Sequence, residues 1–397
     1  MHMRFRGILL GSALLVAGSA IFYAQQKILP APFATPSVNN RPQVIPPPAG
    51  AQLKTPAGFQ MEILQEGFKQ PRFMLLGPSN EILLTDTGGG NGSSPTGVVY
   101  VLNGKERKPV VENLIRPYGL AISNGFLYIG TPESIKRWKY DTKTQTVSGD
   151  GQEIISLKGL GGGHWTRSLL FSRDGKKLFV GHGSGSNVNA GEDPHRAAIS
   201  TYNPDGTGWE VYAAGTRNPI GIHFYPGTDT LYAAVQERDE LGDDLVPDFF
   251  THIQKGAFYG WPYAYAGPNE DPRRKGEKPD LVAKTIAGDV LLGSHVAVLD
   301  FAFYTGKMFP AKYQGGAFLA LHGSWNRSKR VGQTIVYQPF QGGKPSGPLE
   351  EIVAGWALGP DSREVWGRPV AILQLPDGSL LVSEDGNNRV WRLSYKG

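Results

Sequence analysis

One histidine of this sequence stands where acid–base chemistry is possible. His164 lies in the run GGGHWTRS, and the glycines before it remove side-chain bulk and let other backbone approach closely. Histidine ordinarily titrates near neutral pH, which is what a general base requires. A lone histidine can equally be a structural hydrogen-bonding group, so its position in the fold has to decide between the two interpretations.

Three arginines occupy settings that could bind an anion. They stand in the runs Arg116-Pro117, Arg217-Asn218-Pro219 and Arg368-Pro369. Arginine binds a carboxylate through two parallel hydrogen bonds, so a group of arginines would suit a ligand with several carboxylates. Each run alone also fits an ordinary turn with a surface arginine.

Two further segments could bind a metal ion or a ligand: an acidic stretch and a polar loop that contains one tryptophan. The run QERDELGDDLVPD, residues 236–248, is rich in oxygen ligands of the kind that hold calcium, and we include Asp243 and Asp244 as candidate metal ligands. It does not follow the EF-hand spacing, so a solvated acidic loop remains the alternative. In HGSWNRSKR, residues 322–330, Trp325 could stack on a ligand and Arg327 could meet a carboxylate; a solvated loop fits equally well.

Composition and missing motifs exclude several classes of protein. There are no cysteines, which excludes disulfides, thiolate metal sites and cysteine nucleophiles. The motifs of serine hydrolases, zinc proteases, P-loop enzymes and nicotinamide dehydrogenases are not found. The formal net charge of +5 is not concentrated in any basic run, so we expect no nucleic-acid partner.

A repeated β-unit would bring the candidate residues together. Each copy has an apolar strand, a turn of the Pro-Asp-Gly kind and a second strand, as in VAILQLPDGSLLVSED. Six copies begin near residues 70, 116, 164, 218, 298 and 368. Repeats of about this length are typical of β-propellers. A β-sandwich or a pair of barrels is the alternative, but sandwiches show less internal repetition.

The sequence therefore predicts an all-β, six-bladed β-propeller over residues 51–397. Ring closure should pair residues 59–64 with residues 390–394, because open strand edges are avoided. The only helix of any length is expected near residues 245–254. The innermost strand of each blade lines the central channel, so the residues just before these strands should meet at one mouth of the channel; they are Arg116, His164, Arg217, Asn218 and Arg368.

The N-terminal residues predict export. Arg4 and Arg6 precede an uncharged apolar run from Gly7 to Ala24, so we interpret residues 1–28 as a signal peptide or an N-terminal membrane anchor. Residues 29–50 are proline-rich and are expected to form an extended linker without a core. The basic end should stay in the cytoplasm, which places the domain in the periplasm or elsewhere outside the cytoplasm. Residues 7–24 could then anchor the domain in the inner membrane.

These motifs together resemble the glucose/sorbosone dehydrogenases that depend on pyrroloquinoline quinone (PQQ), and more closely their sorbosone dehydrogenase branch. The resemblance covers about residues 51–397, and it is carried by GGGHWTRSLLFSRDGKKLFVGHGSGSN, GTRNPIGIHFYPGT, QERDELGDDLVPDFF, GAFYGWPYAYAG, GGAFLALHGSWNR and WGRPVAILQLPDGSLLVSEDGNN. It implies a six-bladed propeller with PQQ on its axis and a calcium ion beside the quinone. It also implies oxidation of a sugar or aldehyde, with electrons passed to an acceptor such as a cytochrome or a quinone.

The resemblance implies roles for individual residues. His164 would take the proton of a substrate hydroxyl while hydride passes to the quinone, and Arg217 would lie near the reactive quinone oxygens. Asn218, Arg368 and Asp385 match positions beside the cofactor, Arg116 takes the place of an amide contact, and Trp325 and Arg327 are further candidate contacts. The main-chain carbonyl groups of Glu237 and Arg238 match the calcium site.

The sequence also departs from the glucose-oxidising branch. That branch has an aspartate where Gly163 stands and an acid where Ser184 stands, and its acidic loop is shorter. A substrate other than glucose is therefore expected. The alternative is a propeller of the same ancestry without PQQ, acting as a binding module or a metal-dependent lactonase.

Overall fold

Six four-stranded antiparallel sheets follow one another along the chain. A computed structural model describes residues 29–89 and 92–397. The first three sheets are β3 (Pro71–Leu76), β4 (Ile82–Asp86), β5 (Gly97–Asn103) and β6 (Glu106–Leu114); β7 (Leu120–Ser123), β8 (Phe126–Thr131), β9 (Ser134–Asp141) and β10 (Thr146–Ser156); and β11 (Arg167–Phe171), β12 (Leu178–His182), β13 (Ala198–Tyr202) and β14 (Glu210–Ala214).

The other three sheets have the same order from strand to strand. They are β15 (Asn218–Phe224), β16 (Leu231–Gln236), β17 (Pro247–His252) and β20 (Val290–Ser294); β21 (Val298–Phe303), β22 (Ala317–Leu321), β23 (Thr334–Gln338) and β26 (Glu350–Val353); and β28 (Pro369–Gln374), β29 (Leu380–Glu384), β30 (Arg389–Tyr395) and β2 (Phe59–Gln65).

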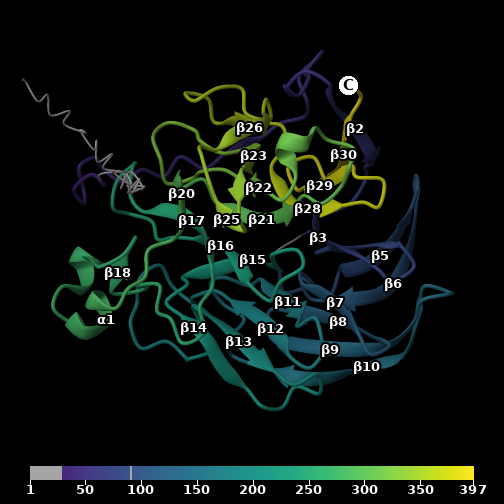
Figure 1. The fold of residues 1–397 in the computed structure, drawn as a ribbon, viewed down its shortest axis with the longest axis horizontal. Helices are drawn as coiled ribbons and strands as arrows, with labels where there is room; N and C mark the ends of the chain where they lie inside the picture. The colour runs from purple at the N-terminus through teal and green to yellow at the C-terminus, as the bar shows by residue number, and fades with distance from the viewer. Residues whose placement is uncertain (1–28, 90–91) are drawn as a thin grey trace, which may run out of the picture.

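The sheets are the blades of a β-propeller. Each innermost strand contacts the innermost strand of the next blade, in the order β3, β7, β11, β15, β21, β28 and back to β3, so the contacts form a closed ring. These strands lie toward the middle of the molecule, and the outer strands radiate from them (Figure 1). The predicted six-bladed, all-β fold is confirmed, and each predicted repeat supplies the two inner strands of one blade.

The hairpin turns have the backbone geometry that their residues favour. Asn124 and Gly125 join β7 to β8 with φ of 51° and 74°, which matches the turn type that continues the twist of a two-residue hairpin. Gly378 has a φ of 88° in the Leu-Pro-Asp-Gly turn between β28 and β29. Any added side chain there would also meet the backbone of Met308 at 2.9 Å. The turn sequences therefore fix where each blade reverses.

The last blade takes strands from both parts of the chain. β2 pairs antiparallel with β30, with Phe59 opposite Tyr395 and Met61 opposite Leu393. This register is the ring closure that the sequence predicted. The apolar core is divided among the gaps between blades, as between β12 and β16, where Phe179, Ile222 and Ala233 belong to one buried cluster. The blades therefore stabilise one another by packing face to face.

The prediction of a helix near residues 245–254 is wrong. Residues 247–252 form β17, which pairs with β16 and β20, and all of its residues except the last are buried. A short apolar run buried on both faces does not distinguish strand from helix by its periodicity. The only α-helix of the described residues is α1 (Pro279–Ala283), which lies with η1 (Pro272–Arg274) and the hairpin of β18 (Ala264–Tyr265) and β19 (Asn269–Glu270) between β17 and β20.

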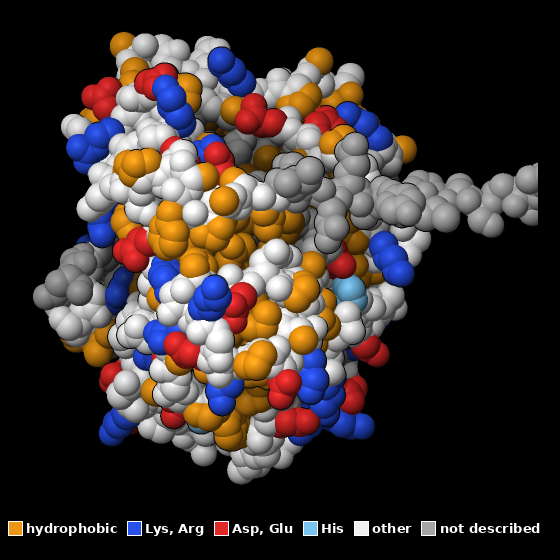
Figure 2. Space-filling view, turned by 90° about the vertical axis from the view of Figure 1, so that its left-hand side faces the viewer, with side chains coloured by type: hydrophobic (Ala, Val, Ile, Leu, Met, Phe, Trp, Pro, Cys, Tyr) orange, Lys and Arg blue, Asp and Glu red, His pale blue; other side chains and the backbone are white. Residues whose placement is uncertain are grey.

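Smaller elements complete the domain. A hairpin of β24 (Phe340–Gln341) and β25 (Lys344–Pro345) joins β23 to β26, and η2 (Ala311–Tyr313) lies between β21 and β22. On the side that carries α1 and β18, apolar side chains form a band across the middle of the surface (Figure 2). No helix in the described ranges is long and apolar enough to cross a membrane. The expected signal peptide or anchor, residues 1–28, lies outside the described residues.

The proline-rich segment that follows is extended, as its composition predicts, but it lies against the propeller. We call residues 29–45 the strap. Its strand β1 (Gln43–Val44) pairs parallel with β27 (Glu364–Val365), and Phe33 donates its backbone N–H to the carbonyl oxygen of Leu241 at 2.8 Å. The strap therefore belongs to the folded domain and is not a free spacer.

Candidate active site

A polar cavity opens at the mouth of the central channel. Its volume is about 270 Å³, and every blade except the second contributes to its lining. The lining includes Arg72, His164, Trp165, Arg217, Asn218, Gln236, Asp239, Asp248, His295, His322, Trp325 and Arg368. Of the residues predicted to meet at the mouth, four line the cavity and Arg116 does not.

His164 is held in one tautomer on the cavity wall. It lies just before β11, and its Nδ1 is 2.8 Å from the carbonyl oxygen and 3.0 Å from the Oγ of Ser184. A carbonyl oxygen only accepts, so Nδ1 carries the hydrogen and Nε2 keeps its lone pair. No described residue bonds Nε2. Burial, and then the charge of Arg217, lowers the pKa of His164 to about 3, so the ring is neutral at physiological pH.

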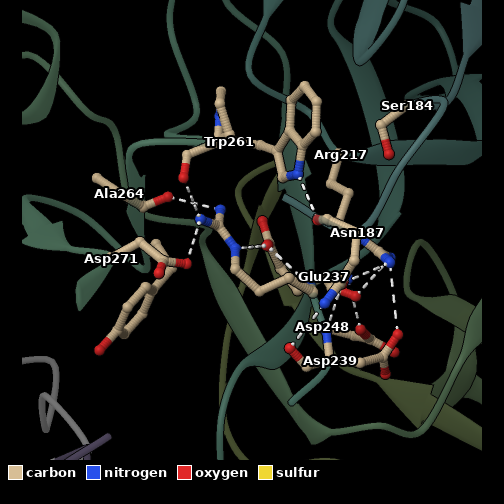
Figure 3. A network of polar contacts seen from close by, with 12 residues as sticks. Ser184, Asn187, Arg217, Glu237, Asp239, Asp248, Trp261, Ala264 and Asp271 are labelled. Carbon is tan, nitrogen blue, oxygen red and sulfur yellow. Dashed lines mark hydrogen bonds and ion pairs between the residues drawn. The ribbon is translucent and has the colours of Figure 1, made fainter. Parts of the chain in front are cut away.

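A hydrogen-bond network holds the guanidinium of Arg217 in place (Figure 3). Nη1 donates to the carbonyl oxygen of Glu237 at 2.7 Å, and Nε donates to that of Asn187 at 3.2 Å. Nη2 donates to Asn187 Oδ1 at 3.1 Å and to Asp239 Oδ2 at 3.4 Å. Burial lowers the pKa of Arg217, and Asp239 opposes this effect. The guanidinium is therefore a fixed positive charge at the cavity.

Three buried polar atoms on residues of the cavity lining lack a protein partner. They are Asn218 Oδ1, Arg72 Nε and Glu237 Oε1. Asn218 begins β15 and uses only its Nδ2, which donates to Gln236 Oε1 at 2.8 Å. Since buried polar groups are nearly always hydrogen-bonded, unsatisfied atoms gathered around one cavity suggest a ligand or ordered water that bonds to them.

A second network holds two more arginines at the cavity. His322 Nε2 lies 2.8 Å from Asp385 Oδ1, and Arg368 Nη2 donates to His322 Nδ1 at 2.9 Å. Asp385 also pairs with Arg72. Burial acts to raise the pKa of Asp385, but His322 and Arg72 hold it far below its usual range. Asp385 therefore acts as the shared anion that orients Arg72 and His322, and it does not itself line the cavity.

Two more predicted contacts, like Asp385, lie outside the cavity lining. Arg116 has a φ of 44° and places its guanidinium over the ring of Trp165, 4.0 Å from the centroid, so it supports a lining residue from behind. Arg327 pairs with Asp244 at 2.8 Å and donates to the carbonyl oxygen of Asp243. Trp325, two residues earlier, does line the cavity.

The acidic stretch does not form a cluster of carboxylates. Asp243 bonds Ser328 and Asp244 pairs with Arg327, while the side chain of Glu237 pairs with Arg238 at 3.0 Å. No group of three or more His, Asp or Glu side chains in residues 29–89 and 92–397 is arranged to hold a metal ion. A cation at this loop would have to take backbone carbonyl oxygens, of which that of Glu237 already accepts from Arg217.

Arg238 instead has a structural position. Its buried guanidinium donates to the carbonyl oxygens of Pro262 at 3.0 Å and Ala264 at 2.6 Å, and it pairs with Asp271 at 3.2 Å. These contacts tie the acidic loop to the segment between β17 and β20 (Figure 3). The side chain therefore fixes the loop whose main chain supports Arg217.

The structure adds residues that the sequence analysis did not select, among them Arg72, Asp239, His295 and His322. Arg72 stands directly after Pro71 at the start of the first repeat, two positions beyond the place that Arg116 and Arg368 occupy before their prolines, so the repeat points to this part of the chain but not to Arg72 itself. The histidines follow or precede strands without a motif, and only the fold shows that they meet. Burial acts to lower the pKa of His295, but its bonds to Asp239 and the Gly242 carbonyl oxygen raise it.

Comparison with known proteins agrees with this architecture. The sequence profile of the TrAA12-like family matches residues 53–271, more than half of the chain. The chain belongs to this family. A solved structure of a TrAA12-like relative, the calcium structure of the family AA12 enzyme of Trichoderma reesei, has a TM-score of 0.74 at 19% identity and covers 89% of this chain and 98% of that one. At this identity the likeness shows a shared fold.

Two curated relatives match this TrAA12-like chain over most of its length. An uncharacterized protein of Borreliella burgdorferi is 29% identical over 356 residues, covering 87% of this chain and 91% of the relative. The PQQ-dependent pyranose dehydrogenase of Coprinopsis cinerea is 24% identical over 412 residues, covering 86% of this chain. The chain spans about half of that dehydrogenase, 54% of its length. The Coprinopsis relative supports the PQQ dehydrogenase resemblance, and neither relative shows the sorbosone branch.

Proposed function

We propose that this protein is a PQQ-dependent sugar dehydrogenase in which His164 is the general base. The observation that carries the proposal is the free Nε2 of a neutral His164 on the wall of a cavity that three guanidinium groups also line. The neutral imidazole offers a lone pair to the proton of a bound hydroxyl. Burial and the neighbouring positive charges lower the pKa of His164. The same charges favour an anionic partner in the cavity, whose negative charge would oppose their effect on the pKa.

The residues present fit PQQ. Arg72, Arg217 and Arg368 come from three different blades and supply the charge-assisted donors that a small molecule with several carboxylates requires. The unsatisfied Nε of Arg72 and Oδ1 of Asn218 offer further hydrogen bonds, and Trp165 and Trp325 add aromatic side chains to the lining. The name of the Coprinopsis relative supports the same cofactor.

Residues of the cavity have distinct roles in the proposed reaction. When bound, PQQ supplies a quinone that accepts hydride from the carbon being oxidised. His164 takes the proton of the substrate hydroxyl at Nε2, because its Nδ1 hydrogen is engaged by Ser184. Arg217 holds a positive charge where negative charge develops, and its fixed contacts mean that it need not reorganise during the step. Arg72 and Arg368 bind and orient carboxylates.

The substrate we propose is a sugar, or a sorbosone-like aldehyde whose hydrate carries the same hydroxyl group. A departure from the glucose-oxidising branch supports a substrate other than glucose. A Cβ at Gly163 would lie 2.3 Å from the carbonyl oxygen of Gly185, so the aspartate of that branch cannot stand here in this backbone conformation. The hydrogen and electrons removed would pass on to a cytochrome or a quinone acceptor.

The proposal also includes a calcium ion whose protein ligands are backbone carbonyl oxygens. The Glu237 and Arg238 carbonyl groups are the expected ligands, and in the described part of the chain no residue donates to the Arg238 carbonyl oxygen. The calcium structure of the Trichoderma relative supports a calcium-binding member of the same fold. Asp243 and Asp244 bond to other residues and are not needed as ligands in this arrangement.

Reconstitution tests the proposal. The purified protein is mixed with PQQ, with and without calcium, and scanned for cofactor absorbance and for dye reduction over a panel of pyranoses, aldoses and hydroxy-aldehydes. We expect substrate-dependent dye reduction that needs PQQ and that chelation with EDTA abolishes until calcium is returned. Hydrolysis of lactones without PQQ, and no PQQ binding, would instead support the metal-dependent lactonase.

A further inference from the structure

The strap reaches the wall of the active-site cavity. Residues 322–330 form the loop after β22 that carries Trp325, and we call this stretch the Trp325 loop. Asn40 donates its backbone N–H to the carbonyl oxygen of Trp325 at 2.7 Å, and the guanidinium of Arg41 lies over the Trp325 ring, 5.4 Å from its centroid. A segment that precedes the propeller in sequence thus contacts a residue that lines the cavity.

The side chain of Asn40 fastens the rest of the loop. Its Nδ2 donates to the carbonyl oxygens of Arg327 and Ser328, both at 3.0 Å. In return, Arg330 Nη2 donates to the backbone oxygen of Asn40 at 2.8 Å and to its Oδ1 at 3.2 Å. One asparagine therefore satisfies main-chain groups on both limbs of the Trp325 loop.

The strap also ties this loop to the acidic loop across the cavity mouth. Asn326 donates to the carbonyl oxygen of Val38 at 2.7 Å, and its Oδ1 accepts the backbone N–H of Glu240 at 2.7 Å. Thr35 Oγ1 accepts the N–H of Asp243 at 2.7 Å. The strap, the Trp325 loop and the acidic loop therefore form one connected unit, although they are far apart in sequence.

We infer that Asn40 and Arg41 are positioning residues that set the place of Trp325 and so complete the cofactor-binding cavity. The inference rests on the proposed function, because it gives Trp325 a ligand to contact. Many of the lining residues lie at or beside the ends of blade strands, whereas Trp325 stands four residues beyond β22 on an irregular loop. The strap supports this loop through hydrogen bonds and a stacked cation, so the propeller without the strap has an incomplete cavity.

Three single variants of the full chain test this inference. Asn40→Ala removes the side-chain bonds to the Trp325 loop, and Arg41→Ala removes the stacked cation. Asn39→Ala is the matched control, because Asn39 is exposed and its side chain makes no hydrogen bond within the described residues. In PQQ-free protein, hydrogen exchange should speed up by about 10-fold in residues 322–330 of Asn40→Ala, since a lost hydrogen bond changes an opening equilibrium by roughly that factor.

PQQ affinity, followed by tryptophan fluorescence, is the second measurement. We expect the dissociation constant to rise by about 10-fold for Asn40→Ala and about 3-fold for Arg41→Ala, with Asn39→Ala unchanged. If both test variants exchange hydrogen and bind PQQ as Asn39→Ala does, the inference is wrong. If the wild-type chain binds no PQQ, the proposed function fails, while the exchange comparison still decides whether the strap holds the loop.

Discussion

At the scale of single residues, the bond from His164 to Ser184 determines what the cavity can do. Because Nδ1 is engaged by a backbone carbonyl oxygen, the proton-accepting atom is Nε2, and rotation of the ring is restricted. Arg217 is fixed by bonds to Glu237, Asn187 and Asp239, so it does not move to meet charge that develops in the cavity.

Replacing the base should slow catalysis without removing the cofactor. In His164→Asn the amide can still donate to Ser184, but no group remains to accept the proton, so kcat should fall by about 10²–10⁴-fold. The PQQ dissociation constant should change little. Steady-state kinetics and a PQQ titration measure both. Ser184→Ala, which keeps the backbone acceptor for Nδ1, is the control and should retain most of the wild-type kcat; wild-type turnover in His164→Asn would make His164 a structural histidine.

The protonation state of His164 can be measured directly. Its pKa is lowered to about 3 by burial and Arg217. The neutral ring is the form present above that value, so lowering the pH through the ordinary histidine pKa of about 6.5 should not protonate it. Nitrogen NMR of the PQQ-free protein, assigned with His164→Asn, should show the Nδ1–H tautomer at pH 5. A titration midpoint near the ordinary value would contradict this environment.

The site could be predicted where repeat position and residue type coincide. His164, Arg217, Asn218 and Arg368 each stand just before an innermost strand or at its start, and the structure places all of them around the cavity. Arg116 has the same position in its repeat, but its side chain turns onto Trp165. Sequence position fixes where the backbone of a residue lies, whereas the rotamer depends on neighbours such as Trp165 that belong to another blade.

At the scale of elements, β30 closes the ring of blades, so substitutions in this strand should lower the stability of the domain. Leu393 is fully buried in β30 and packs in the cluster between the fifth and sixth blades. Leu393→Ala should lower the free energy of unfolding by about 2–5 kcal/mol, the usual loss for a leucine in a packed core. Ser394→Ala on the same strand, half-buried, is the control. Urea unfolding compares them, and equal midpoints would show that the closing blade is not cooperative with the others.

The elements were predictable where turn chemistry marked them. Turns such as Asn124-Gly125, Asp174-Gly175 and Pro376-Asp377-Gly378 identified inner hairpins of the blades, and the pairing of residues 59–64 with 390–394 followed from the need to cover open edges. The outer strands and β17 were harder to predict from the sequence. The apolar run Pro247–His252, for example, does not show the periodicity that distinguishes a strand from a helix. The strap could not be foreseen, since Asn40 bonds to main-chain groups of a loop almost three hundred positions away.

At the scale of the whole molecule, the compartment remains a prediction. The basic and apolar N-terminal residues predict export, so cell fractionation should find the domain in the periplasm or on the outer face of the inner membrane. A chain that lacks residues 1–24 should stay in the cytoplasm, which makes it the control. Recovery of the full-length chain from the cytoplasm in soluble form would overturn this prediction.

The pairing of β2 with β30 also sets an order of events when the protein is made. β2 is among the first strands to leave the ribosome, yet its partner is not synthesised until the last few residues of this sequence. Until then the growing polypeptide is an open arc with an unpaired edge, the kind of intermediate that depends on chaperones. A premature stop codon before β30 would therefore remove the strand that closes the ring and, with it, much of the stability of the five blades already made.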